Sequence, residues 1–251
     1  MTGLLARRER LLGSGAPLFY QDPVNIVRGE GVWLFDTDGR RYLDLYNNVP
    51  CVGHCHPHVV EAMHQQAGTL NVHNRYLHEG VLDYAERLTG LHVDPIASAI
   101  FTCTGTEANE VALSMARVAT GGRGIICSNA AYHGNSAEVG KLNRVKQTEE
   151  AINAEIRSIP YPQCYRPLRD GVSSSELTNL YLAEVQAAID RFKTSGIPLA
   201  GMLVCPILAN EGVPDIPDGF MARAATMIRE AGGLFIADEV QAGFCRTGKW
   251  W

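Results

Sequence analysis

The sequence predicts an α/β protein with a mostly parallel sheet and helices on both faces, preceded by an N-terminal helix and a small β-meander. Two observations lead to this prediction. From about residue 57, helical patterns alternate with short apolar runs, the order that builds parallel βαβ units. The last apolar run, Leu234–Ala237, leads directly into Asp238. A buried parallel strand has this pattern when it delivers a charged group to the carboxyl edge of a sheet.

The first fifty residues are expected to form a separate part of the protein. Residues 1–10 have an amphipathic pattern closed by Gly13-Ser14-Gly15, and they lack the long apolar run of a signal peptide. Asp36-Thr37-Asp38-Gly39 is a strong hairpin signal. The predicted strands of the meander are Val24–Val27, Val32–Phe35 and Arg41–Leu45. We therefore expect residues 1–50 to form a helix and meander of a small domain, and residues 51–251 to form a ligand-binding large domain.

The large domain is expected to alternate helices with strands. The predicted helices are 57–69, 78–91, 106–119, 176–194 and 219–231. The predicted strands are Ala99–Cys103, Gly124–Cys127, Gly201–Cys205 and Leu234–Ala237. Residues 140–175 contain three prolines and little periodicity, so we expect a long loop that could border the site.

Composition excludes several classes of function. The 251 residues are 46% hydrophobic and 20% charged, which is ordinary for a globular enzyme. A net charge of −5 and a pI near 5.9, without a basic stripe, argue against a nucleic-acid partner. No window approaches the length and apolarity of a membrane span. The seven cysteines are odd in number and scattered, so we expect reduced thiols in a cytoplasmic protein.

A strand, a glycine turn and a helix start follow one another around Gly105. The free N–H groups and positive dipole end of a helix N-terminus make a ready anion site. Gly105 lets the backbone approach a ligand, and Thr104 and Thr106 add hydroxyl donors. An ordinary capping box, completed by Glu107, explains the same residues. Taken alone, this segment favours the capping box.

Aromatic and polar residues follow the next strand. Tyr132 and His133 precede Gly134 at the carboxyl end of the run 124–128, so they should face the same sheet edge as the glycine turn. A flat ring could stack on Tyr132 or His133. A tyrosine and a histidine that simply line a turn are the alternative, which this segment alone favours.

Asp238 is suited to a cationic partner, because an unpaired buried charge is very costly. A protonated pyridine nitrogen would fit, and Gln241 could donate to a ring oxygen. A helix N-cap after a strand is an equally good explanation of Asp238. Glu211 also follows a strand and is a candidate for substrate recognition, although a solvated loop acid is the alternative.

The segment Cys51-Val52-Gly53-His54-Cys55-His56-Pro57-His58 suggests a metal site. It lacks a C-x-x-C pair and a partner cluster downstream, and Pro57 fits the start of a helix. We therefore expect no metal here, and a loop on the substrate side explains the segment better.

Together, the glycine turn, the aromatic turn and the acid with glutamine three residues later resemble the class III aminotransferases. These are fold-type I enzymes that use pyridoxal 5′-phosphate (PLP). The resemblance extends over essentially the whole chain, and the matching segments are 53–57, 104–109, 132–134, 238–241, 243–244 and 246–248. Tyr46-Asn47-Asn48-Val49-Pro50 and Asn74-Arg75-Tyr76-Leu77-His78 are similar to the subgroup near alanine–glyoxylate aminotransferase and the ethanolamine-phosphate phospho-lyases.

The resemblance implies a role for each candidate residue. Gly105 and Thr106 would hold the phosphate of PLP, Tyr132 would stack on its ring and His133 would lie beside it. Asp238 would pair with the ring nitrogen as the catalytic acid group.

Gln241 would contact the phenolic oxygen and Glu211 would meet the substrate. The implied reaction moves an amino group between an amine or amino acid and a keto acid or aldehyde. Elimination from a phosphorylated amino alcohol is the alternative. The full-length protein would be a homodimer.

One departure from the family concerns the lysine that binds PLP covalently. It lies a short way beyond the Asp–Gln motif, and this chain ends at Trp251 before reaching it. The lysines after the glycine turn lack the family's surrounding residues: Lys141, Lys146, Lys193 and Lys249. We therefore expect a PLP-binding large domain truncated before its end, in a fragment that does not transaminate alone. The alternatives from other classes are a non-catalytic remnant and, least favoured, a zinc hydrolase using His54, His56 and Asp238.

Overall fold

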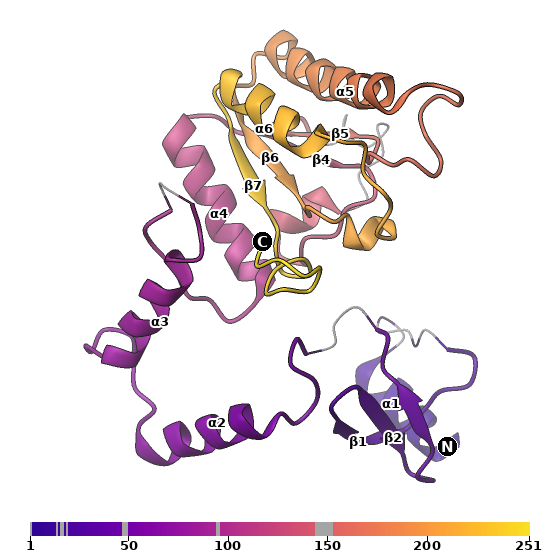
Figure 1. The fold of residues 1–251 in the computed structure, drawn as a ribbon, viewed down its shortest axis with the longest axis vertical. Helices are drawn as coiled ribbons and strands as arrows, with labels where there is room; N and C mark the ends of the chain where they lie inside the picture. Colours follow the sequence, from indigo (N-terminus) through magenta and orange to yellow (C-terminus); the bar gives the residue numbers. More distant parts are fainter. Residues whose placement is uncertain are drawn as a thin grey trace. The chain divides into compact units, whose positions relative to one another are not determined.

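The computed structural model describes residues 2–13, 15, 18, 20–46, 50–93, 96–143 and 153–251 (Figure 1). The chain divides into two compact units, Met1–His78 and Glu79–Trp251. This division lies later than the expected one after residue 50, and the assignment of functional domains stays a prediction. Ser14, Asn47, Asn48, Val49 and Lys146, which entered the sequence predictions, lie outside the described residues.

The first unit holds the predicted helix and β-meander. Its elements are α1 (Thr2–Leu12), β1 (Ile26–Glu30), β2 (Trp33–Asp36), β3 (Arg41–Leu43) and α2 (Pro57–Thr69). The three strands are antiparallel in the order β1-β2-β3. In the hairpin turn, Asp36 Oδ1 accepts the backbone N–H groups of Asp38 at 3.0 Å and Arg40 at 2.8 Å. The turn chemistry of the sequence therefore sets this hairpin.

The second unit is built on a parallel four-stranded sheet, as predicted. Its strands are β4 (Gly124–Ser128), β5 (Ile156–Ile159), β6 (Leu199–Val204) and β7 (Leu234–Ala237). They lie in the order β5-β4-β6-β7, and each neighbouring pair is parallel. Parallel strands need crossover connections, which place helices on the faces of the sheet.

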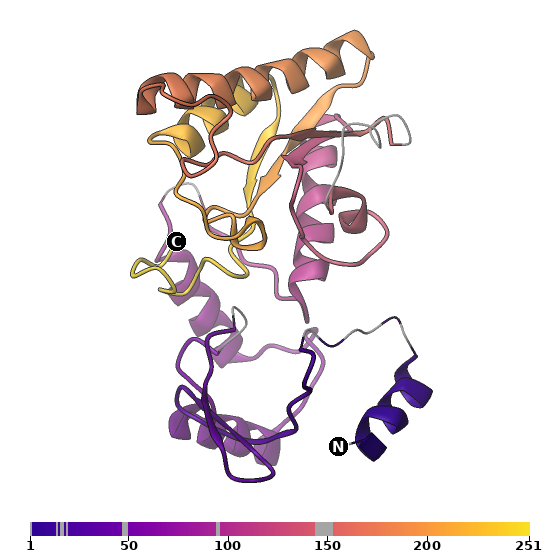
Figure 2. The same ribbon diagram turned by 90° about the vertical axis from the view of Figure 1, so that its right-hand side faces the viewer.

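Helices cover both faces of this sheet (Figures 1 and 2). Alternate residues of each strand point to opposite faces. Ile126 packs in the cluster that contains α5 (Ser174–Thr194) and α6 (Phe220–Glu230). Ile125 and Cys127 pack in the cluster that contains Leu113 of α4 (Gly105–Thr120). The unit also contains α3 (Glu79–Thr89), η1 (Val139–Leu142) and η3 (Ala209–Glu211).

One predicted strand is wrong. Ala99–Cys103 forms no strand and pairs with no strand in the described part of the chain. A β-strand exists only through its ladder partner, and here the apolar side chains stay accessible, with Ile100 61% and Phe101 48% exposed. Phe101 instead stacks on Tyr84 with ring centroids 5.5 Å apart.

One strand was missed, because residues 140–175 were predicted as a long loop. β5 contains Arg157, which interrupts the apolar pattern that marks the other strands of the sheet. The arginine is nevertheless buried. Its guanidinium packs over the Phe192 ring, 4.9 Å from the ring centroid. It also donates to the carbonyl oxygens of Ala154 at 3.0 Å and Ile156 at 2.8 Å. Tertiary partners thus allow a charged residue where the sequence indicates a loop.

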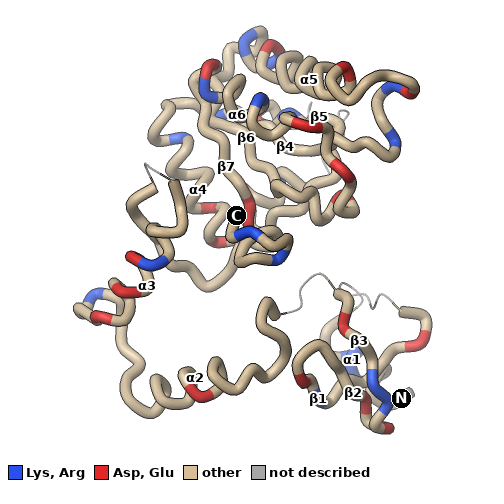
Figure 3. The backbone as a smooth tube through the Cα atoms, viewed as in Figure 1, with Lys and Arg blue, Asp and Glu red and all other residues tan. Residues whose placement is uncertain are grey.

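Charged residues of both signs are mixed along the helices of the α/β unit (Figure 3). This distribution agrees with the modest net charge of −5. Among the helices that the structure describes, none combines the length and apolarity that crossing a bilayer requires.

Candidate functional site

A cavity of about 150 Å³ lies at the carboxyl ends of the parallel strands. This is the edge where open α/β sheets bind ligands. All six residues predicted to contact the cofactor line it: Gly105, Thr106, Tyr132, His133, Asp238 and Gln241. Its remaining lining residues are Gly134, Cys205, Asn210 and Val240. Residues far apart in the sequence are therefore brought together around one small volume.

The start of α4 forms one wall of the cavity. The capping box that the sequence allowed is present: Thr104 Oγ1 accepts the Glu107 N–H at 3.1 Å, and Glu107 Oε2 accepts the Thr104 N–H at 3.1 Å. The cap engages Thr104 and Glu107, whereas Gly105 and Thr106 line the cavity. The N–H groups of the first turn have no acceptor within the helix, and they lie at its positive end. The cap therefore leaves Gly105 and Thr106 facing the cavity.

Two glycines permit close approach of the segments around the cavity. A Cβ on Gly105 would lie 2.6 Å from Val240 Cγ2. Gly134 has a φ of +139°, and a Cβ there would lie 2.5 Å from Thr106 Oγ1. A side chain at either position would push against the facing residue, Val240 or Thr106, so glycine allows the close approach at both.

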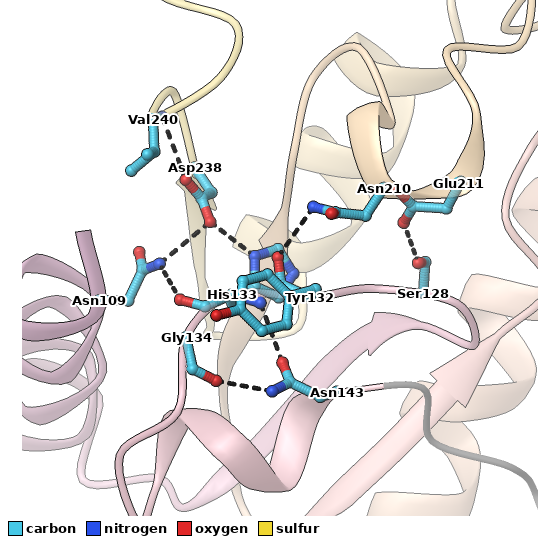
Figure 4. Close-up of polar contacts among 10 residues, drawn as sticks. All are labelled: Asn109, Ser128, Tyr132, His133, Gly134, Asn143, Asn210, Glu211, Asp238 and Val240. Atoms are coloured by element: carbon cyan, nitrogen blue, oxygen red, sulfur yellow. Dashed lines mark hydrogen bonds and ion pairs between the residues drawn. The ribbon is translucent and has the colours of Figure 1, made fainter. Parts of the chain in front are cut away.

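Asp238 is held at the end of β7 by several donors (Figure 4). Its backbone N–H continues the ladder by donating to Val204 O at 2.9 Å. Its Oδ2 lies 2.7 Å from His133 Nδ1 and accepts Asn109 Nδ2 at 3.0 Å. Its Oδ1 accepts the Val240 N–H at 3.1 Å. The N-cap alternative does not apply, because turns rather than a helix follow β7.

The carboxylate is buried yet favoured in its charged form. Asp238 is 8% exposed. Burial by itself raises the pKa of Asp238, but the hydrogen bond and charge of His133, with donation from Val240 and Asn109, hold the pKa below its ordinary value. The site therefore offers a negative charge at one wall and helix N–H donors at another.

His133 is buried beside this carboxylate. Its side chain is 2% exposed, and Nδ1 must carry the hydrogen that faces Asp238 because an ionised carboxylate only accepts. Within the described residues, no hydrogen-bond partner reaches its Nε2 atom. The Asn143 side chain fixes the turn by accepting the His133 N–H at 2.9 Å and donating to Gly134 O at 2.6 Å.

Tyr132 presents an accessible ring to the cavity. It is 41% exposed, and its hydroxyl accepts Asn135 Nδ2 at 2.8 Å. The Asn210 side chain donates to the Tyr132 carbonyl at 3.2 Å and so ties the loop after β6 to this turn. Near them, burial raises the pKa of the Cys205 thiol, which keeps it neutral.

Glu211 is not among the residues that line this cavity. It lies in η3, where its Oε1 accepts a hydrogen bond from Ser128 Oγ at the end of β4. Its Oε2 is buried without a hydrogen-bond partner in the described part of the chain. It lines an adjacent, more open pocket together with Tyr161 and Arg166. Its role toward a substrate stays a prediction.

Three asparagines of the site were missed from the sequence. Asn109, Asn143 and Asn210 each make hydrogen bonds that join separate segments of the cavity. Asn109 ends the segment 104–109 that resembles the class III aminotransferases, but the resemblance assigned it no role. Its spacing, one helical turn after Gly105, places both on the same side of α4. Nothing in the sequence marks Asn143 and Asn210, because their partners are backbone groups of distant residues.

The histidine segment of the first unit has a structural role. His54 Nε2 lies 2.8 Å from Asp44 Oδ2. The His54 backbone pairs with Gly31 through bonds of 2.7 and 3.0 Å. Among the residues that the structure describes, no three His, Cys, Asp or Glu side chains are arranged to hold a metal ion.

Comparison with known proteins identifies the family. The family described as aminotransferase class-III matches residues 19–251. The chain belongs to the class III aminotransferases. This agrees with the resemblance seen in its motifs.

Two curated relatives illustrate the similarity. Alanine–glyoxylate aminotransferase 2 homolog 2 from Arabidopsis thaliana is 36% identical over 99% of this chain and 51% of its own length. Ethanolamine-phosphate phospho-lyase homolog 1 from Caenorhabditis elegans is 30% identical over 99% of this chain and 56% of its own length. The chain thus spans about half the length of the curated relatives it matches.

Solved structures of similar proteins confirm the predicted fold. A phospholyase from Arthrobacter in complex with phosphoethanolamine has a TM-score of 0.90 at 40% identity, covering 99% of this chain and 58% of that one. Taurine:2-oxoglutarate aminotransferase from Bifidobacterium kashiwanohense, in complex with PLP and glutamate, has a TM-score of 0.83 at 25% identity, covering 100% and 58%. The second unit therefore has the fold of the PLP-dependent transferases.

The prediction of a cytoplasmic protein is wrong. The Arabidopsis relative is named as mitochondrial, and so is alanine–glyoxylate aminotransferase 2 from Pongo abelii, which is 31% identical over 92% of this chain and 49% of its own length. The prediction rested on unpaired cysteines, which do not distinguish one reducing compartment from another.

Proposed function

We propose that this chain is the cofactor-binding part of a PLP-dependent aminotransferase. The enzyme moves an amino group between an amine or amino acid and a keto acid or aldehyde. One observation carries the proposal. The Asp238 carboxylate, which is buried and accepts several hydrogen bonds, lines the same cavity as the N-terminus of α4. A ligand with a cationic ring and an anionic tail complements both walls.

The residues of the cavity fit PLP in chemistry. The first-turn N–H groups of α4 and the Thr106 hydroxyl are donors suited to the phosphate. A Cβ on Gly134 would meet the Thr106 hydroxyl at 2.5 Å, so glycine keeps that donor accessible. Asp238, with its lowered pKa, is suited to hold a proton at the ring nitrogen.

When bound, PLP supplies an electron sink for carbanion chemistry at the substrate. The residues of this chain orient it. Gly105 and Thr106 would hold the phosphate, Tyr132 would stack on the ring and His133 would lie beside it. Asp238 would keep the ring nitrogen protonated, and Gln241 would donate to the phenolic oxygen. Glu211 meets the substrate from the adjacent pocket.

Covalent attachment of the cofactor needs a lysine. In the described part of the chain, none of Lys141, Lys193 and Lys249 lines the cavity. We therefore expect residues 1–251 alone to bind PLP without a covalent bond and not to transaminate. The active enzyme is a homodimer that takes small-molecule amines and keto acids as substrates.

Elimination of phosphate from a phosphorylated amino alcohol is the second candidate function. It is favoured by the similarity to the Arthrobacter phospholyase, which was solved with phosphoethanolamine. Incubating the active enzyme with phosphoethanolamine separates the two reactions. Phosphate release without an amino acceptor would support the lyase, whereas keto-acid-dependent amino transfer without phosphate release would support the transferase.

Titration of the purified chain with PLP, followed by tryptophan fluorescence, tests the site directly. The wild-type chain should bind PLP saturably, and Asp238→Asn should weaken binding about ten- to a hundred-fold, because charge-assisted bonds contribute about 1.5–3 kcal/mol. Asp190→Asn is the matched control, since it removes an exposed carboxylate on α5. Equal affinities of wild type and Asp238→Asn for PLP would refute the proposed role of the acid.

A further inference from the structure

The Asn109 side chain connects three of the segments that line the cavity: the start of α4, the turn after β4 and the end of β7. It is 5% exposed, on the side of α4 that also carries Gly105 one turn earlier. Its Nδ2 atom donates to His133 O at 2.9 Å and to Asp238 Oδ2 at 3.0 Å (Figure 4). Both partners only accept, so the amide nitrogen must face them, and each of its two hydrogens is used.

These bonds restrict the orientation of Asp238. Its Oδ2 receives one bond from Asn109 and one from His133, and its Oδ1 receives the Val240 N–H. The three donors come from α4, from the turn after β4 and from the turn after β7. Removing Asn109 would leave Oδ2 with a single side-chain donor and would leave the buried His133 carbonyl without its amide partner, a costly arrangement.

We propose that Asn109 is a positioning residue that aims the Asp238 carboxylate at the ring nitrogen of the cofactor, an inference that rests on the function proposed above. Because the first turn of α4 also holds the phosphate, one helix then sets the spacing between the two ends of the ligand. A side chain that merely supports the fold would affect every ligand of the cavity alike. A positioning residue affects only ligands that carry the ring nitrogen.

Two probes separate these roles. The first is PLP and the second is its carbocyclic analogue, in which C–H replaces the ring nitrogen. The wild-type protein should prefer PLP over the analogue by about ten- to a hundred-fold, the value of a charge-assisted hydrogen bond. In Asn109→Leu this preference should fall to no more than about threefold, while affinity for the analogue stays within about threefold of wild type.

Asn210→Leu is the matched control. Asn210 also lines the cavity and donates an amide bond, but its partner is the Tyr132 carbonyl rather than Asp238. Any loss of affinity in Asn210→Leu should therefore fall equally on both probes, and the preference for PLP should remain.

Asn109→Asp provides a second variant of nearly unchanged shape. Near neutral pH two carboxylates would face each other, so the preference for PLP should be lost. As the pH falls, a proton on the new carboxyl restores a donor to Asp238, and the preference should return toward the wild-type value. Comparison with wild type at each pH controls for the other ionisable groups near Asp238, which both proteins share: His133, Cys205 and Glu239.

The outcomes distinguish a failure of the Asn109 inference from a failure of the proposed function. Loss of preference in Asn109→Leu, or its proton-dependent return in Asn109→Asp, supports the inference. Retained preference in both Asn109 variants, together with loss in Asp238→Asn, overturns the inference and leaves the proposed function standing. A wild-type protein that binds both probes equally refutes the role of Asp238 and the inference with it.

Discussion

His133 Nδ1 and Asp238 Oδ2 lie 2.7 Å apart, although 105 positions separate the two residues in the sequence. The contact is buried, and Asn109 bridges it by bonding to both residues. Because each partner comes from a different segment, the contact depends on the fold of the whole α/β unit. Substitutions of these residues should therefore change the stability of the fold as well as the affinity for a ligand.

Asp238 should make the stability of the chain depend on pH. Its pKa is lowered in the folded state, so the ionised form stabilises the fold. That contribution is complete above the unfolded pKa of about 3.9 and is lost as the pH falls through the lower folded value. Asp238→Asn should therefore reduce the free energy of unfolding by about 1–3 kcal/mol at pH 7 and by less at acidic pH. Urea unfolding at several pH values measures the free energy of unfolding of wild type and of Asp238→Asn. A difference between the two proteins that does not change with pH would contradict the prediction.

Gly134→Ala should impair both stability and PLP binding. The residue has a φ of +139°, and the new Cβ would lie 2.5 Å from Thr106 Oγ1. We expect a loss of about 1–3 kcal/mol from backbone strain, with weaker PLP binding because the Thr106 hydroxyl is displaced. Gly171→Ala is the control, since its φ is +73° but no atom lies within 4 Å of the new Cβ. It should lower stability by about 1 kcal/mol and leave PLP affinity unchanged, so equal binding losses in both variants would argue against a local effect.

Gly105→Ala should be rescued by shortening its neighbour. The new Cβ would meet Val240 Cγ2 at 2.6 Å, whereas Val240 Cβ lies at an ordinary 3.5 Å. The single variant should weaken PLP binding about tenfold, because displacing Val240 also moves a donor of Asp238. The double variant Gly105→Ala, Val240→Ala should recover most of the affinity in the same fluorescence titration. Additive losses in the double variant would show that the clash is not the cause.

The sequence predicted most of the fold because its signals are local. The turn at 36–39, the capping box at Thr104 and the apolar run before Asp238 each specify their own structure. The resemblance of its motifs to the class III aminotransferases pointed to the six residues that line one cavity. The errors arose where distant partners decide the outcome: Ala99–Cys103 lacks a ladder partner in the described residues, and Arg157 is buried in β5 by its contact with Phe192.

The sequence by itself determined most of the helices and strands, the glycine turn and the acid after the last strand, because hydrophobic periodicity and turn chemistry act over a few residues. Only the tertiary structure decided that Asn109 and His133 both donate to Asp238, that Asn143 and Asn210 fix the turn at 132–134, and that Glu211 lies in a neighbouring pocket. These contacts join segments far apart in the chain. Their geometry follows from the packing of α4 against the parallel sheet rather than from any local pattern.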